Sequence, residues 1–459
     1  MFQTLKNAWK TAELKSKLLF TLLIVILYRL GSAIPVPWVA GEVGEMFTQA
    51  NFAVQLLAGD AFSKATLFAL SVSPYITSSI IVQLLTIAIP ALERWAKDGA
   101  NGKKKIDLLT RIITMALAVV TAIGYANLID VYGLVNYGDT NKTFAKIVII
   151  ACYVAGAAMV MWLAEKINEH GIGNGISIIL FANIIARLPY TFTNFYHMIA
   201  DATTAGGVIT GIVWSLIIAA LMIVIVWIVI WFTESERRIP VQYAKRVVGS
   251  KMYGGQSSSL PLKLNMAGVM PVIFANSIVS IPGTLATIFD PKGTGFLTNL
   301  ATNYFNYTKP LYVLISVILL FAFAFFYIMI SFNPVEVANN IRNNGGAVPG
   351  IRPGKPTRDY IQKILNRITF IGAIFLCIVS EVPKIIVSIF ETIKDVAATQ
   401  AKPGAVINAI VNFYNSGANS FLTVAFAGTS ILIVVGVILE TVRELEAQLT
   451  MRNYKGFLD

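Results

Sequence analysis

The sequence predicts an all-α polytopic membrane protein with ten transmembrane helices. Hydrophobic residues make up 56% of the chain and charged residues only 13%, and the mean hydropathy is +0.70. Apolar stretches of about 20 residues, long enough to cross a bilayer, recur along the whole chain. A water-soluble domain could not bury this much apolar surface, whereas a helix in lipid satisfies its own backbone polar groups. The predicted spans are 18–38, 67–91, 108–130, 145–165, 174–193, 208–233, 266–289, 310–333, 364–388 and 418–440.

The first apolar stretch, Leu18–Leu27, follows four lysines and has the outline of a secretory signal peptide. It continues through Tyr28 to Pro35 without a small-residue cleavage site. We therefore expect this stretch to be retained as the first span.

The distribution of basic residues predicts the orientation of the chain. If the N-terminus is inside, 26 of the 36 Lys and Arg residues lie in the connections on that side and 7 on the other. Cytoplasmic connections of membrane proteins carry the excess of Lys and Arg. Both termini are therefore predicted to be cytoplasmic, which requires an even number of spans.

Residues 51–66 lie between the first two spans and are half apolar and half small or polar. The segment is too short to span the bilayer and too apolar for a free loop. A re-entrant half-helix fits if protein or a cavity surrounds it. A helix lying on the outer membrane surface fits the composition equally well.

The second span is unusually polar for a helix that faces lipid on every side. Such a helix either lines water or packs on its neighbours through small hydroxyl side chains. Its polar residues are Ser71, Ser73, Thr77, Ser78, Ser79, Gln83 and Thr86.

Two cytoplasmic connections, 234–265 and 334–363, are far longer than a tight turn between helices requires. Residues 241–248 tend to alternate and turn residues follow them, which predicts an extended hairpin. The second connection is punctuated by Gly and Pro, which predicts a rigid loop. Their basic residues either control topology or dock a partner.

Catalytic and metal-binding patterns are missing from the sequence. There is no Walker loop, no metalloprotease motif and no nucleophile elbow. Cys152 and Cys377 lie inside apolar stretches and the two histidines, His170 and His197, stand far apart, so we predict no disulfide, metal site or cofactor. These absences favour a passive conduit or a scaffold that another component drives.

Charged side chains are nearly absent from the centres of the predicted spans. Glu381 and Lys384 are placed near the outer end of the ninth span by counting about 1.5 Å per residue. A secondary small-solute transporter, the alternative from another class, normally needs buried acids at its coupling site. The sparse charges therefore argue against a transporter.

Seven short motifs occur in an order that resembles the SecY family, whose members are channel subunits of the bacterial protein translocase. Each motif is weak alone, but the ordered set is specific and extends from the first span to the cytoplasmic tail. The motifs are RLGSAIPVP at 29–37, PYITSSIIVQLL at 74–85, HGIGNGIS at 170–177, YAKR at 243–246, NMAGVMPVIFA at 265–275, FNP at 332–334 and VPGIRPG at 348–354.

The resemblance implies two five-helix halves, 1–200 and 201–459, related by inverted pseudo-symmetry. It also implies that residues 51–66 form a plug that closes the channel from outside. The plug positions implied are Leu57, Ala58, Gly59, Asp60, Ala61, Phe62 and Ser63.

The resemblance implies a ring of apolar side chains that closes the pore waist. A narrow apolar constriction dewets and resists ion flow. Relatives favour isoleucine in the ring, so the valine and the leucine here are mild departures. The matching positions are Val72, Ile76, Ile176, Leu180, Ile273 and Ile433.

A second opening, sideways into lipid, is implied between spans two and three on one side and seven and eight on the other. Gln83 and Asn276 match polar positions of this lateral gate. An ordinary interhelical hydrogen bond is the alternative reading of both residues.

The partners implied are the SecA motor ATPase, the translating ribosome, small SecE- and SecG-type membrane subunits, signal sequences with their precursor chains, and membrane lipids. Docking positions on the two long connections are matched or neighboured by Arg246, Lys251, Arg352 and Lys355. Many relatives have two basic residues at the first loop's tip, whereas this chain has Ser250 and Lys251. The implied role is a non-enzymatic protein-conducting channel in the bacterial plasma membrane.

Overall fold

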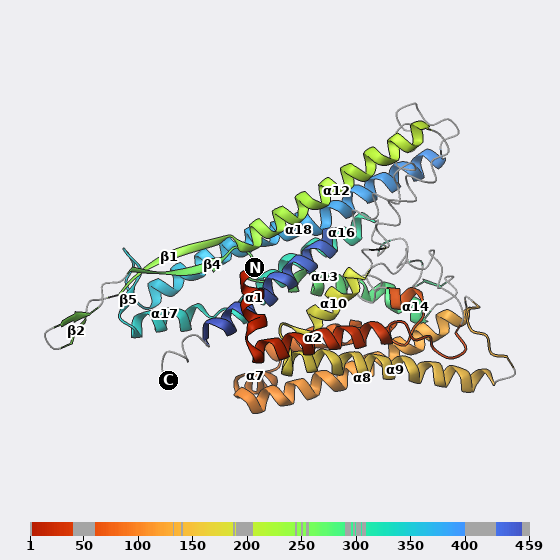
Figure 1. The fold of residues 1–459 in the computed structure, drawn as a ribbon, viewed down its shortest axis with the longest axis horizontal. Helices are drawn as coiled ribbons and strands as arrows, with labels where there is room; N and C mark the ends of the chain where they lie inside the picture. Colours follow the sequence, from red (N-terminus) through yellow and green to blue (C-terminus); the bar gives the residue numbers. More distant parts are fainter. Residues whose placement is uncertain are drawn as a thin grey trace.

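The computed structural model is mostly helical, and every predicted span contains a helix (Figure 1). The structure describes residues 2–39, 60–131, 133–138, 141–186, 189, 205–243, 246–248, 251–253, 257–289, 295–296, 299, 304, 309–399 and 428–451. The helices in the predicted spans are α2 (Ala12–Gly31), α6 (Ser73–Ala88), α8 (Gly99–Val131), α9 (Lys142–His170), α10 (Gly175–Ile185), α12 (Ala205–Glu234), α13 (Met270–Val279) with α14 (Ile281–Phe289), α16 (Pro310–Ser331), α18 (Lys355–Thr399) and the helix at 428–451. Shorter helices are α1 (Phe2–Lys10), α5 (Asp60–Ser63), α7 (Pro90–Lys97) and α17 (Pro334–Asn343).

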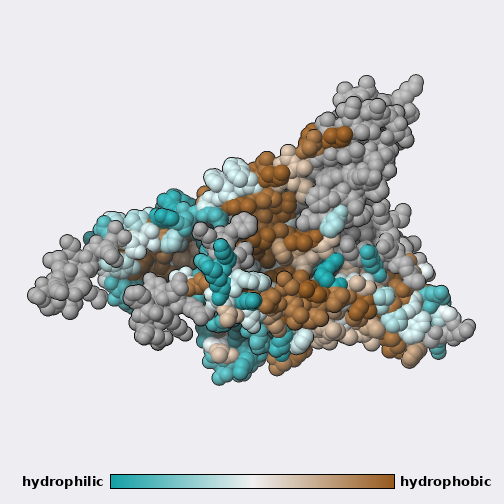
Figure 2. Space-filling model, viewed as in Figure 1, coloured by the Kyte–Doolittle hydropathy of each residue, from teal (hydrophilic) through white to brown (hydrophobic). Residues whose placement is uncertain are grey.

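Within the described residues, four helices are long and apolar enough to cross a membrane, or five if one bent pair counts as a span. Three further apolar helices, 175–185, 219–234 and 270–286, are shorter. The all-helical membrane fold is confirmed. The described helices are consistent with ten spans, and the number ten stays a prediction. The face in Figure 2 carries a broad hydrophobic band across the helices, with hydrophilic residues toward the sheet and the helix ends.

The helices form two groups that meet along one seam. In the first group α9 packs against α2 and α8, and α8 packs against α6. In the second group α16 packs against α13 and α18, and α12 lies beside α18 with Phe232 stacked on Phe375 at 3.8 Å between ring centroids (Figure 1). The seam consists of α6 against α13 and α8 against α14.

The second span differs from the straight helix expected over 67–91. Helix α6 begins only at Ser73, with Pro74 in its first turn, and ends at Ala88. Pro90 starts α7 at an angle of 103° to α6. The proline holds the residue before it, Ile89, in an extended conformation, which ends the helix.

The hairpin predicted in the first long connection is confirmed. Strand β1 (Glu236–Tyr243) pairs antiparallel with β4 (Ser257–Lys263), and β2 (Arg246–Val248) pairs with β3 (Lys251–Tyr253). Strand β5 (Gly346–Ala347) of the second connection pairs with the other edge of β1. The two long connections therefore share a three-stranded sheet, β4-β1-β5, that projects from the helices, and β2 and β3 form a separate two-stranded sheet (Figure 1).

The second connection was expected to be a punctuated loop, and its first part is instead the helix α17. Asn333 caps this helix, because its Oδ1 accepts from the backbone N–H groups of Val335 (3.1 Å) and Glu336 (3.5 Å). Pro334 occupies the first helical position, where no N–H is required. The Asn-Pro pair that ends the eighth span thus also starts a new helix.

A glycine in α9 lets the segment before α6 approach closely. A Cβ at Gly156 would lie 2.0 Å from the carbonyl oxygen of Leu67, and a backbone atom cannot rotate away. We expect Gly156→Ala to destabilise the protein by about 1–3 kcal/mol, the usual cost of overpacking. The measurement is the thermal midpoint in detergent, with Ala151→Val on the exposed side of α9 as control. Equal midpoints for both variants would contradict the close approach.

Candidate functional site

The six predicted waist residues all belong to, or pack against, one large apolar cluster that joins many of the helices. Val72 and Ile76 come from the start of α6, Ile176 and Leu180 from α10, and Ile273 from α13. Ile433 comes from the helix at 428–451. Five of the six are buried and Ile176 is half-buried against the same cluster. Apolar side chains from four separate helices therefore belong to the same packed cluster.

The turn before α10 fixes the two waist residues of that helix. Asn174 caps the helix through Oδ1, which accepts from the backbone N–H groups of Ile176 (3.0 Å) and Ser177 (3.4 Å). Gly173 has a φ of +83°, a value that favours glycine. Its backbone N–H donates to Oε2 of Glu444 at 2.8 Å. This bond ties the start of α10 to the helix at 428–451, so two helices that carry waist residues are joined.

The predicted plug lies only partly within the described residues. Leu57, Ala58 and Gly59 lie outside them, and Asp60–Ser63 form the short helix α5. Ala61 (2% exposed) is buried, and Phe62 (5% exposed) belongs to a second apolar cluster formed with α8 and α9. The described end of the segment is therefore packed into the protein.

The seam between the helix groups coincides with the predicted lateral gate, but its two polar residues do not pair with each other. The Gln83 amide donates to Oγ of Ser79 on its own helix at 3.4 Å. Asn276 Oδ1 accepts from Nζ of Lys384 in α18 at 3.3 Å. Each residue is thus bonded on its own side of the seam.

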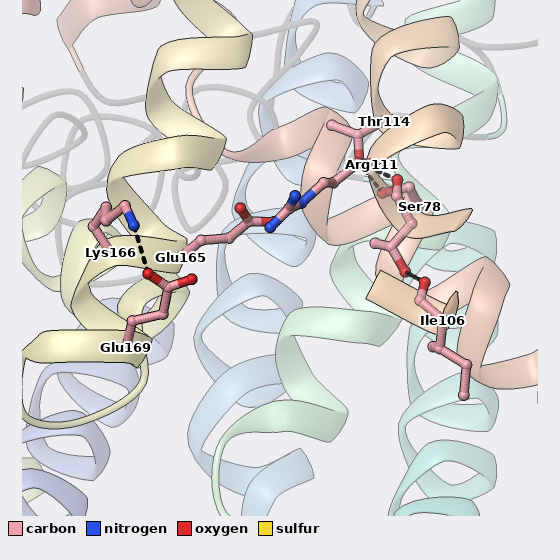
Figure 3. A network of polar contacts seen from close by, with 8 residues as sticks. Ser78, Ile106, Arg111, Thr114, Glu165, Lys166 and Glu169 are labelled. Carbon is pink, nitrogen blue, oxygen red and sulfur yellow. Dashed lines mark hydrogen bonds and ion pairs between the residues drawn. The ribbon is translucent and has the colours of Figure 1, made fainter. Parts of the chain in front are cut away.

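Polar contacts connect the helices on the N-terminal side of the seam. Figure 3 shows the hydroxyl of Ser78 in α6 facing that of Thr114 in α8, with which it forms a hydrogen bond. Arg111 of α8 reaches Glu165 of α9, with Nε 2.8 Å from Oε1. Helices α6, α8 and α9 are therefore cross-linked by side chains as well as packed.

A buried ion pair connects the helices on the C-terminal side. Nζ of Lys384 lies 2.9 Å from Oε1 of Glu381, and both residues are 2% exposed. The same Oε1 accepts from Ser316 of α16 at 3.0 Å. Together with the contact to Asn276 of α13, the pair joins α13, α16 and α18.

Sequence reasoning placed Glu381 and Lys384 near a span end and gave them no role. The structure instead shows a buried polar centre between α13, α16 and α18. The available signal was an acid and a base three residues apart in an otherwise apolar span, a spacing that places both on one helix face.

The predicted docking residues all lie on the projecting sheet or beside it. Arg246 belongs to β2 and Lys251 to β3, on either side of the hairpin tip. Arg352 and Lys355 are exposed where the second connection enters α18. The pairing of β5 with β1 brings the two predicted docking connections side by side.

No cluster of three or more potential metal ligands occurs among the residues with described positions. The candidate site thus consists of the apolar cluster with the six predicted waist residues, a seam between two polar-linked helix groups, and the projecting sheet with the predicted docking residues on or near it.

Comparison with known proteins shows similarity along the whole chain. The SecY family profile matches residues 66–442. The protein translocase subunit SecY of Streptomyces galbus is 40% identical over 100% of both chains, and that of Mycobacterium bovis is 38% identical over the same share.

Solved structures share the fold at lower sequence identity. One described as the structure of a protein conducting channel has a TM-score of 0.62 and 16% identity, and the match covers 94% of this chain and 92% of that one. Sec61 in the canine ribosome-channel complex from the endoplasmic reticulum has a TM-score of 0.57 and 15% identity, with the same coverage of 94% and 92%.

Proposed function

The chain belongs to the SecY family and is the channel subunit of a protein translocase, and we propose that polypeptides cross the membrane through the waist formed by its six apolar side chains. The observation that supports this proposal is that all six, from four helices, belong to or pack against one apolar cluster. In the resting channel the waist excludes water and ions by dewetting. It widens around an unfolded chain because its side chains offer no hydrogen bond to hold the passenger.

The seam between the two helix groups is the proposed lateral gate. Each side is linked internally, through Ser78 and Thr114 on one side and through Lys384 with Asn276 on the other. Interhelical hydrogen bonds in membranes are worth about 0.6 kcal/mol on average, so a seam of weak contacts can exchange them for contacts with a signal helix. The two groups would then separate as units.

Partitioning into lipid would sort the passing segments. Each Leu or Ile at a helix centre favours lipid by about 0.3–0.6 kcal/mol, and each charge costs about 2.5–3.5 kcal/mol. Ten leucines therefore gain about 3–6 kcal/mol, which one or two central charges cancel. The channel needs only to expose a segment to lipid and contributes no catalytic group of its own.

The driving force would come from partners on the cytoplasmic side. We propose the SecA motor ATPase and the translating ribosome, with SecE- and SecG-type subunits beside the helices. The basic projecting sheet suits contact with phosphates of ribosomal RNA, without sequence recognition. We further propose that the protein lies in a bacterial plasma membrane with both termini in the cytoplasm.

The test is reconstitution in vesicles with a SecE-type subunit and the SecA motor ATPase. A signal-bearing precursor is expected to become protected from added protease when ATP is supplied. Accumulation of small solutes without precursor movement would support the transporter alternative instead, which the family relationship does not favour.

The docking proposal predicts that Arg352→Glu weakens ribosome binding by about tenfold or more, because one charge-assisted contact to phosphate is worth about 1.5–3 kcal/mol. The measurement is cosedimentation with ribosomes over a range of salt concentrations. Arg342→Glu, in the exposed part of α17, makes the same charge change within the same connection. Equal losses for both variants would show general attraction rather than docking at Arg352.

A further inference from the structure

Three buried tyrosines from three helices contact the segment 60–72, which connects the predicted plug to the waist. The phenol of Tyr125 in α8 donates to the carbonyl oxygen of Phe62. The phenol of Tyr153 in α9 donates to the carbonyl oxygen of Ala65 at 3.2 Å. The phenol oxygen of Tyr28 in α2 lies 3.0 Å from Oγ of Ser71. We call Tyr28, Tyr125 and Tyr153 the tyrosine clasp.

The clasp is inaccessible to water. Tyr28 and Tyr153 are 0% exposed and Tyr125 is 5% exposed. The ring of Tyr125 lies 4.8 Å from that of Phe62 and 5.1 Å from that of Tyr153, measured between centroids. Water cannot easily replace these phenols, so their hydrogen bonds are made with the segment or lost.

Two backbone positions in the segment adopt a conformation that side chains other than glycine seldom take. Ala65 has a φ of +48° and Ser71 a φ of +47°. Such strain persists only when the surrounding structure holds it in place. Both residues are direct partners of the clasp, Ala65 through its carbonyl oxygen and Ser71 through its hydroxyl.

The clasp also reaches the waist. The Tyr28 phenol donates to Oδ1 of Asn183 at 2.8 Å, and the Asn183 amide donates to Oγ of Ser71 at 3.1 Å. Asn183 lies on α10 three residues after the waist residue Leu180, and Ser71 directly precedes Val72. The side chains of Tyr28, Ser71 and Asn183 are thus hydrogen-bonded to one another, next in sequence or within one helical turn of two predicted waist residues.

We propose that the tyrosine clasp holds the segment 60–72 in its closed-channel conformation and so positions both the base of the plug and Val72. The three tyrosines are positioning residues for the seal. This inference rests on the proposed channel function. It identifies where the closed state is held, namely on the inner sides of α2, α8 and α9 rather than at the gate seam.

The test removes single phenol oxygens through Tyr28→Phe, Tyr125→Phe and Tyr153→Phe. Tyr125→Phe and Tyr153→Phe are each expected to raise the resting ion conductance of reconstituted channels about fivefold, the factor for losing one hydrogen bond of about 1 kcal/mol from the closed state, and Tyr28→Phe, which loses two, at least as much. The variant with all three changes is expected to exceed any single one. Tyr137→Phe is the matched control, because its phenol donates to Asp130 and not to the segment.

A second readout separates gating from stability. In a background with Cys152 and Cys377 replaced by alanine, Ser63→Cys reports access to the segment through labelling by a membrane-impermeant maleimide from outside. The clasp variants are expected to label about fivefold faster at temperatures well below their thermal midpoints. If the variant with all three changes does not fold, the three single variants are used to test the clasp.

Unchanged conductance and labelling in all three folded single variants would overturn the clasp, and so would an equal rise in Tyr137→Phe. Lowered thermal midpoints with unchanged conductance would show a structural role only. Signal-dependent precursor transport is measured on the same vesicles. Transport by a variant with unaltered conductance refutes the clasp alone, whereas absence of transport by the unaltered chain refutes the channel function.

Discussion

Replacing Ile76 and Ile273 together with glycine is expected to raise the resting ion conductance by at least about tenfold, because the seal depends on narrow apolar dewetting. Both side chains are 2% exposed and belong to the central cluster, one on each side of the gate seam. Their removal widens the constriction and exposes backbone polar groups to it. The measurement is the conductance of single channels in planar bilayers without precursor.

The matched control is the pair Val82→Gly and Val279→Gly. Each lies six residues beyond its waist counterpart on the same helix, which turns it to a different face, and both are as buried as the waist pair. This variant carries the same helix-weakening glycines. Equal conductance of the two double variants would remove the waist role from Ile76 and Ile273.

Replacing Lys384 with methionine is expected to cost about 3–5 kcal/mol of stability, the usual effect of leaving one partner of a buried ion pair uncompensated. Glu381 would be left beside two serine hydroxyls without its cation. The contact to Asn276 would also be lost, and with it a link between α13 and α18. The first measurement is the free energy of unfolding in detergent. The second is the minimum hydrophobicity that a signal sequence needs for lateral release into lipid.

The double variant Glu381→Gln with Lys384→Met provides the critical comparison, because it removes both charges. It is expected to recover most of the stability, since a neutral buried pair carries no uncompensated charge. Lys363→Met, at an exposed position of the same helix, is expected to stay within about 0.5 kcal/mol of the unaltered chain. A double variant less stable than Lys384→Met alone would contradict the proposed ion pair.

Local sequence patterns were sufficient to predict the helices and the hairpin. The apolar spans are visible because lipid imposes length and composition on each one separately. The hairpin between Glu236 and Lys263 is visible because alternation and turn residues are local signals. The waist positions came from the family resemblance, since apolar pairs four residues apart occur in any membrane helix.

Features that depend on distant partners could not be predicted from the sequence. The tyrosine of each clasp contact is an ordinary aromatic residue until α2, α8 and α9 pack around the segment 60–72. Lys384 is an isolated charge until Asn276 lies beside it. The bend at Ile89 could have been predicted from the sequence, because a proline follows directly. The apolar composition around it suggested one continuous span instead.

The most direct test of the central claim is site-specific crosslinking of a precursor halted partway through the reconstituted channel. A photoreactive amino acid is placed in turn at each of the six waist positions, and at Val82 and Val279 as controls. Crosslinks are expected from the waist positions to the halted chain, and few or none from the controls. Efficient transport with no crosslink at any waist position would contradict that claim.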